Sequence, residues 1–155
     1  MKLIGPAIDR RTECEAILRS LPMWFGIEQA LRMYVEDTAL LPTFGLEDAG
    51  ALRGFLTLRE HFPESWDIHC LAVHADVRNG GLGSRLLAHA EAWLVGHGVR
   101  FLQVKTVAAT SDSAAYAETR AFYFARGFTP LEVFPHLWDA HNPALQCVKA
   151  LRTTE

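Results

Sequence analysis

Cysteine is scarce in this sequence, and long apolar runs are missing. Cys14, Cys70 and Cys147 are the three cysteines, an odd number with no paired spacing. We therefore expect reduced thiols and a cytoplasmic location rather than a disulfide framework. No apolar run approaches the ~20 residues of a membrane span, and the interrupted start at 1–6 is too short for a signal peptide. The sequence thus predicts no membrane partner.

Basic charge is not in excess either. The chain has 15 Lys and Arg against 18 Asp and Glu, a formal net charge of −3, and its basic residues are scattered. This pattern argues against a nucleic-acid partner. The seven histidines fall on different predicted elements without metal-ligand spacing, so we expect no metal site. Apolar residues make up 50% of the 155 residues, enough for one sizeable core, and we expect 1–155 to form a single domain.

The most informative segment is a glycine-rich turn that follows the apolar stretch 71–73. Gly80, Gly81 and Gly83 leave the backbone bare, Ser84 begins a predicted helix, and Arg78 adds a mobile cation at the entrance. Converging backbone N–H groups at a helix N-terminus bind phosphate, so the segment predicts a diphosphate cradle.

The dipeptide at 79–80 also favours a β-hairpin turn. A hairpin needs a second strand of period two, but the next residues show helical spacing. The apolar positions are Leu82, Leu86, Leu87, Ala90, Trp93 and Leu94. The turn therefore connects a strand to a helix.

The remaining patterns predict a mixed α/β fold, with one layer of sheet and helices on its faces. Strands are expected near 2–4, 40–46, 51–59, 66–73, 100–107, 128–134 and 145–151. Helices are expected from a capping box at Thr12 and Glu15 to Pro22, over 27–37, from Ser84 to Gly96 or Gly98, and from a cap at 111–113 to about 126. A turn at 47–50 predicts a hairpin, and a proline-bounded loop is expected at 135–143. The strand, helix and strand from 66 to 107 predict a parallel crossover.

Two motifs carry a specific resemblance. Arg78-x-x-Gly81-x-Gly83 follows the strand that ends at Val73, and Tyr123 precedes Gly127-Phe128 on a later helix. This combination resembles the GCN5-related N-acetyltransferase (GNAT) superfamily, most specifically over about 66–128. The resemblance implies an acyl-CoA N-acyltransferase fold, with a central, mostly antiparallel sheet, a splayed parallel strand pair and flanking helices.

The resemblance implies acetyl-CoA (coenzyme A) as the cofactor. Arg78 and the N–H groups of the loop would hold the pyrophosphate, and the strand edge would pair with the pantetheine arm. The Val73 amide would stabilise charge on the thioester oxygen. Many members carry Asn where this chain has Tyr116, so pantetheine contacts are expected at Thr119 or the backbone. The implied binding residues are Leu71, Ala72, Val73, Arg78, Asn79, Gly80, Gly81, Leu82, Gly83, Ser84 and Thr119.

The implied reaction is direct attack of an amine on the thioester in a ternary complex, which requires a base and an acid. Tyr123 matches the family's general acid, and Tyr116, Thr119 or Arg120, and Tyr123 form a polar helical stripe expected to face the cofactor.

Asp67 and His69 are the candidate bases, on one strand face by period two. An unperturbed imidazole titrates near pH ~6.5, so a histidine can relay a proton through water. The other interpretations are that His69 is merely half-buried and Asp67 solvated, and Glu64 is a further candidate. Cys70 is expected on the opposite face from His69, as a core residue.

The acceptor is less defined by the sequence. The family's usual acceptor region points to Met23, Trp24, Phe25, Trp138 and His136. These aromatic residues indicate an apolar part, although they also suit a closed core. Nearby Glu60, Glu64 and Asp67 indicate a cationic amine, and a small-molecule amine, an amino acid, a peptide N-terminus and a lysine side chain all stay open.

The alternative function is a non-catalytic acyl-CoA-binding sensor or regulatory module, in which the loop binds but Tyr123 is idle. The presence of Tyr123 favours an enzyme. A homodimer is left open.

Overall fold

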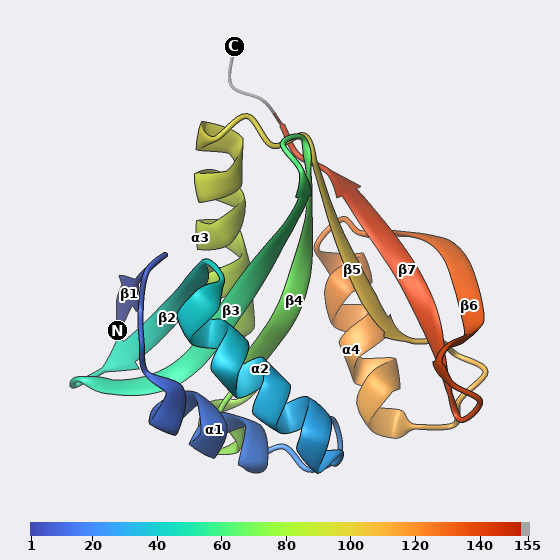
Figure 1. Cartoon of the computed structure of the whole chain (residues 1–155), viewed down its shortest axis with the longest axis horizontal. Helices are drawn as coiled ribbons and strands as arrows, with labels where there is room; N and C mark the ends of the chain where they lie inside the picture. The colour runs from blue at the N-terminus through green and yellow to red at the C-terminus, as the bar shows by residue number, and fades with distance from the viewer. Residues whose placement is uncertain (153–155) are drawn as a thin grey trace.

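The computed structural model describes residues 1–152 as a sheet flanked by helices (Figure 1). The elements are β1 (Lys2–Ile4), α1 (Arg11–Arg19), α2 (Glu28–Leu40), β2 (Thr43–Asp48), β3 (Ala51–Phe62), β4 (Ser65–Val73), a 3₁₀ turn η1 (Ala75–Val77), α3 (Leu82–Gly96), β5 (Phe101–Val107), α4 (Ala114–Ala125), β6 (Thr129–Asp139) and β7 (Asn142–Ala150). No helix within residues 1–152 is long and apolar enough to cross a membrane.

The sheet has seven strands in the order β1-β2-β3-β4-β5-β7-β6. Every neighbouring pair is antiparallel except β4 and β5, which are parallel and joined through α3. The predicted fold class and crossover are confirmed. The β4–β5 ladder extends only from Ser65–Phe101 to Ile68–Val104. Beyond this ladder the strands diverge (Figure 1).

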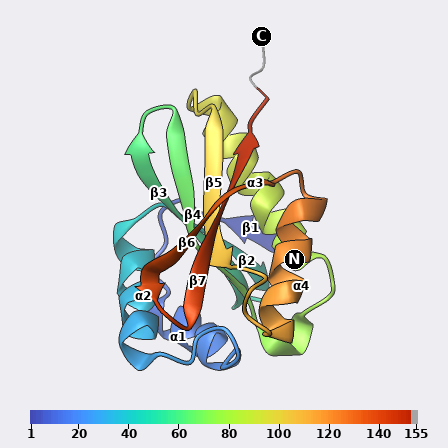
Figure 2. The same cartoon turned by 90° about the vertical axis from the view of Figure 1, so that its right-hand side faces the viewer.

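Two apolar cores lie on opposite faces of the sheet. The stripe predicted for α3, including Leu86 and Leu94, is buried against β2, β3 and β4. Cys14, Ile17 and Leu18 of α1 are buried with β3 and β4 on the other face. α4 lies beside β5, and β6 and β7 form the sheet edge nearest the viewer in Figure 2. Both faces are therefore covered beside β4.

The predicted capping box on the first helix is wrong. α1 begins at Arg11, and its N-cap Arg10 makes no side-chain capping bond. Glu13 instead accepts hydrogen bonds from Arg10 (2.9 Å) and from the Leu52 backbone N–H (2.7 Å). Glu13 thus fixes α1 to the β2–β3 hairpin. The predicted turn of this hairpin at 47–50 is present, with Gly50 at φ +82°.

Two segment predictions also need correction. α2 continues to Leu40, so β2 begins at Thr43 rather than near residue 40. The loop expected at 135–143 is mostly strand, because β6 runs through Pro135 to Asp139. β6 is an outer strand that pairs only with β7, and an edge strand tolerates the missing proline N–H.

β4 contains a bulge at His69. Cys70 pairs with Thr57, but the next β3 residue, Leu58, pairs with Ile68, so His69 is an extra residue. The bulge turns both side chains toward α1 and α2: His69 contacts Asp37, and Cys70 packs in the core beneath α1. The prediction that Cys70 and His69 face opposite sides is therefore wrong. Cys70 is a core residue, and burial raises the pKa of its thiol.

Candidate functional site

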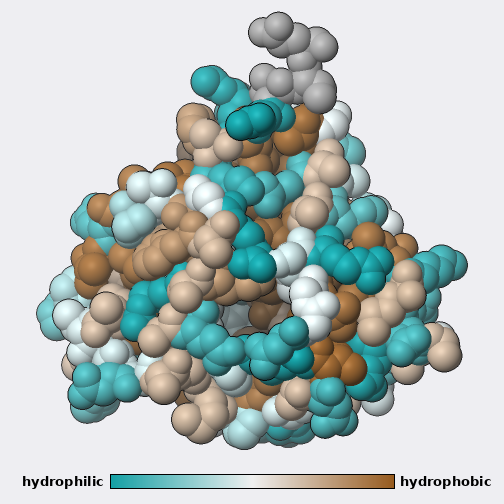
Figure 3. All heavy atoms as spheres, turned by 180° about the vertical axis from the view of Figure 1, so that it is seen from behind, coloured by the Kyte–Doolittle hydropathy of each residue, from teal (hydrophilic) through white to brown (hydrophobic). Residues whose placement is uncertain are grey.

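A cavity of about 630 Å³ opens where β4 and β5 diverge. Its walls come from both strands, the loop before α3, α4, and the segment 21–25 between α1 and α2. The face seen in Figure 3 is hollowed near its centre, with hydrophilic side chains around an apolar floor. The splay of the sheet therefore makes room for a ligand between two strands.

The glycine loop presents free backbone donors to this cavity. Gly81 is the N-cap of α3 at φ +79°, where an added Cβ would meet no atom within 4 Å. A Cβ at Gly83 would lie 3.3 Å from the Phe122 ring, so this glycine lets α3 approach α4. Within residues 1–152, the N–H groups from Asn79 to Ser84 donate no backbone hydrogen bond. The loop is a ready anion site, although α3 begins at Leu82, two positions before Ser84.

Two arginines lie beside the loop. Arg78 is not the mobile cation expected from the sequence: its guanidinium lies 4.1 Å from the Trp24 ring centroid and 3.4 Å from the Glu118 carboxylate. Arg126 was missed by sequence reasoning. It donates to the Ser84 hydroxyl and lies 4.0 Å from the Phe122 ring centroid. Both cations line the cavity and can face an anionic ligand.

The β4 edge beyond the ladder exposes backbone groups toward the cavity. His74 donates its N–H to Arg53 on β3 (2.8 Å). Because successive N–H groups of a strand point to opposite sides, the Val73 N–H points away from β3, toward the side that β5 has left. This edge can therefore pair with an extended ligand.

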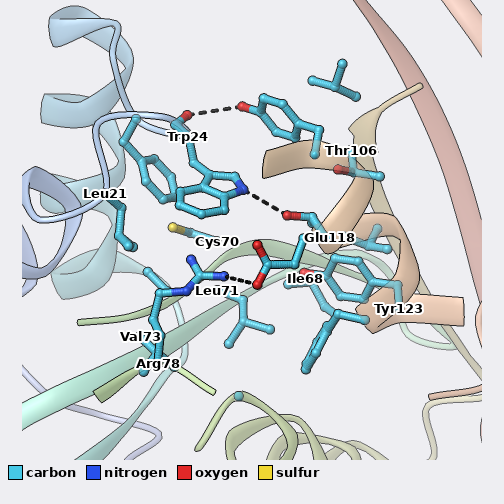
Figure 4. A pocket seen from close by; sticks show the side chains of 18 of the residues that line it. Leu21, Trp24, Ile68, Cys70, Leu71, Val73, Arg78, Thr106, Glu118 and Tyr123 are labelled. Atoms are coloured by element: carbon cyan, nitrogen blue, oxygen red, sulfur yellow. Dashed lines mark hydrogen bonds and ion pairs between the residues drawn. The ribbon is translucent and has the colours of Figure 1, made fainter. Parts of the chain in front are cut away.

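Trp24 forms a clasp across the cavity, from the α1–α2 loop to α4 (Figure 4). Its indole N–H donates to the Thr119 hydroxyl at 2.9 Å, and its carbonyl accepts from the Tyr116 hydroxyl at 3.1 Å. Arg120 instead donates to the carbonyl of Val107. Three side chains of the predicted polar stripe on α4, those of Tyr116, Thr119 and Arg120, are thus already hydrogen-bonded within the protein.

Tyr123 is buried at the cavity wall, with 6% of its surface exposed. Its ring packs edge-on against Phe122 and Phe128, at centroid distances of 5.2 and 5.3 Å. Burial raises the pKa of the Tyr123 hydroxyl above its usual value, which keeps the group protonated. A protonated phenol beside the splay is suited to donate a proton.

The two candidate bases have different surroundings. His69 lines the cavity, and its Nε2 lies 2.8 Å from Asp37 Oδ2 on α2. Asp67 Oδ2 lies 3.3 Å from His61 and 3.8 Å from Lys105. Asp67 Oδ1 is buried and has no hydrogen-bond partner, and it is the one such side-chain atom within residues 1–152. His69 Nδ1 has no protein hydrogen-bond partner in that part of the chain and is not fully buried.

The predicted acceptor residues are only partly brought together. Trp24, Phe25 and Trp138 line the cavity, as do Tyr34 and Lys105, which sequence reasoning missed. Met23, His136, Glu60 and Glu64 are exposed and do not border it, so the expected acidic group is not assembled there. No set of three metal-binding side chains gathers among residues 1–152.

The sequence model of the Acetyltransferase (GNAT) family matches residues 12–128. This match covers the glycine loop, the diverging strands and Tyr123. A search of curated protein sequences gives no match.

Solved structures share the fold over nearly the whole chain. A GNAT-family protein from Desulfovibrio desulfuricans superposes with a TM-score of 0.82 at 17% identity, covering 97% of this chain and 99% of that one. The aminoglycoside 6'-N-acetyltransferase from Enterococcus faecium gives 0.77 at 18% identity, with 100% and 99% covered. The ribosomal-protein-S18-alanine N-acetyltransferase from Escherichia coli gives 0.73 at 16% identity, with 99% and 97% covered.

Proposed function

The chain belongs to the GNAT acetyltransferase family, and we propose that it transfers an acetyl group from acetyl-CoA to a primary amine of a small molecule or peptide. The observation that carries this proposal is the coincidence of a free helix N-terminus, an unpaired strand edge and a buried tyrosine around one cavity. We take residues 1–155 as one catalytic domain.

The residues at the splay fit a coenzyme A molecule. The loop from Asn79 to Ser84 would hold the pyrophosphate through its N–H groups, with Arg78 and Arg126 beside it. An added Cβ at Gly81 would take up the open space that the loop leaves. The edge from Leu71 to Val73 would pair with the pantetheine arm, and Thr119 lies on the opposite wall.

Acetyl-CoA supplies an activated thioester when bound. The Val73 N–H would donate to the thioester oxygen and stabilise the negative charge that grows there during attack. This role is supported by the orientation of the Val73 N–H away from β3.

His69 would act as the base, directly or through water. Its contact with Asp37 at 2.8 Å favours a proton on Nε2, which leaves Nδ1 as the basic atom on a residue that lines the cavity. Asp37 would thus be a positioning residue. Asp67 does not line the cavity, so it would not take the proton itself. Its carboxylate would instead influence the neighbouring charges of His61 and Lys105.

Tyr123 would act as the acid that protonates the leaving sulfur. In the balanced reaction, the amine nitrogen forms a bond to the acetyl carbon and the C–S bond breaks. An ammonium substrate gives up two protons. One proton is returned to the sulfur, through Tyr123, and the other is released to solvent.

Location and assembly remain predictions. The free thiols of Cys14, Cys70 and Cys147 support a reducing compartment such as the cytoplasm. The exposed Leu131 and Leu137 on edge strand β6 support a homodimer.

A calorimetric titration with acetyl-CoA, compared with CoA and ATP, tests the cofactor assignment directly. We expect binding of acetyl-CoA and CoA and none of ATP, followed by CoA release when amines are added. Folded protein that binds no acetyl-CoA would contradict the proposal.

A further inference from the structure

The point at which β4 and β5 separate has a basic side chain on each strand. The last pair of the ladder is Ile68–Val104, so His69 and Lys105 are the first residues beyond it. Both line the cavity, and the nearest ion-pair contact of Lys105 is Asp67 at a long 3.8 Å. Paired strands are about 4.8 Å apart, and His69 and Lys105 directly follow the last pair. They therefore flank the narrow end of the cavity, which we call its mouth.

The charges around this mouth do not suit a polycation. Asp37 lies within 4 Å of His69 and Arg59, at 2.8 and 3.7 Å. Asp67 lies 3.3 Å from His61 and 3.8 Å from Lys105. Each carboxylate thus already faces two basic side chains, and Arg59 and Lys105 balance the two negative charges. A polyamine would find no surplus of negative charge here, whereas a carboxylate in the cavity can pair with Lys105, whose contact with Asp67 is long.

The walls next to the mouth are apolar and aromatic. Phe25 and Tyr34 pack edge to face at 5.9 Å, and Tyr34 lies 5.1 Å from the His69 ring. Burial raises the pKa of Tyr34 to about 12, so it stays uncharged. Trp138 of β6 adds a 47% exposed indole to the same cavity. An acceptor with an apolar side chain can pack there.

We propose that the acceptor is a free α-amino acid with an apolar side chain, whose carboxylate pairs with Lys105 while its amine faces His69. The proposal rests on the acetyl transfer proposed above and names its acceptor. The narrow mouth favours an amine and a carboxylate that share one carbon. The transfer then yields an N-acetyl amino acid, CoA and one proton.

CoA release with four acceptors tests this proposal: phenylalanine, phenylalaninamide, phenethylamine and an aminoglycoside. Loss of one charge-assisted contact costs about tenfold to a hundredfold. We therefore expect kcat/KM for phenylalanine to exceed that for the amide and for phenethylamine by at least about tenfold. Lys105→Met should collapse this preference mainly through KM. Lys2→Met, the same change on the exposed outer strand β1, should keep it.

Direct binding gives a readout that does not depend on turnover. Titration of the CoA-loaded protein should show tighter binding of phenylalanine than of phenethylamine, and Lys105→Met should remove the difference. Equal or better use of acceptors without a carboxylate would overturn the amino-acid assignment but keep acetyl transfer. If acetyl-CoA binds and no amine of any class releases CoA, the proposed function fails as well.

Discussion

The β4–β5 pair has two halves that differ in how their backbone groups are used. From Ser65 to Ile68, β4 is paired on both sides, with β3 and with β5. After the bulge at His69, from Cys70 to Val73, it has β3 on one side only, and the cavity on the other. The paired half holds the sheet together, and the splayed half leaves donors free for a ligand. Chemistry is thus expected where the ladder ends, and changes in the two halves should have separable effects.

The largest effect is expected from a charge in the glycine loop. Asp and Asn both tolerate the left-handed backbone of Gly81, at φ +79°, but only Asp adds a negative charge. Gly81→Asp should weaken acetyl-CoA binding by more than about a hundredfold through repulsion of the phosphates, and Gly81→Asn by much less. Calorimetry would measure both. Equal binding by the two variants would show that no phosphate lies at this loop.

Removal of the Tyr123 hydroxyl separates binding from turnover. Tyr123→Phe keeps the ring contacts with Phe122 and Phe128 but removes the proposed proton donor. We expect kcat to fall by about 10²–10⁴-fold with little change in acetyl-CoA affinity. Single-turnover and binding measurements would check this. Unchanged turnover on every acceptor would favour a non-catalytic role for the chain.

The Asp37 carboxylate should affect turnover through His69. Asp37→Asn can place a donor against Nε2 and favour the other tautomer, so kcat should fall on the order of tenfold to a hundredfold. Acetyl-CoA affinity and the unfolding temperature should change little. Glu36→Gln alters the exposed neighbour that pairs with Arg11 and serves as the control. A loss of stability without a loss in kcat would assign Asp37 a purely structural role.

The smallest effect is expected far from the splay, at Glu13. Arg10, and then the Leu52 N–H, lower the pKa of the Glu13 carboxyl, so its contribution to stability is present above the usual glutamate pKa of ~4.3. The contribution is lost as pH falls through the lowered value. Glu13→Gln should cost at most about 1 kcal/mol at neutral pH, because the pair is partly exposed and screened. Denaturant unfolding at pH 7 and below pH 4 should show this gap closing, with CoA binding intact.

The glycine loop and Tyr123 could be predicted because each lies in a short motif with its own local signal. Asp37, Lys105 and Arg126 could not, since each acts through a partner on another element: Asp37 is 32 residues from His69, and Arg126 is 42 from Ser84. No local pattern encodes such a contact. The bulge at His69 could not be predicted for the same reason, because it is defined only by the register against β3.

In β6, which runs through Pro135, a local signal is present but gives the wrong prediction. A proline usually ends a strand, and the sequence alone does not tell that β6 lies at the sheet edge. Thr12 and Glu15 have the spacing of a capping box, yet the tertiary contacts of Glu13 set where α1 begins. Tertiary position decided both cases against local preference.

The short β4–β5 ladder also has a mechanical consequence. Four residue pairs, from Ser65–Phe101 to Ile68–Val104, make up the parallel backbone connection between the two parts of the sheet. The ladder can therefore act as a hinge between the two parts. The hydrogen bonds of Trp24 with Thr119 and Tyr116 connect the parts a second time, between the α1–α2 loop and α4. A rotation about this ladder would move the glycine loop farther than the ladder itself, and the Trp24 hydrogen bonds would resist it while every strand pairing stays intact.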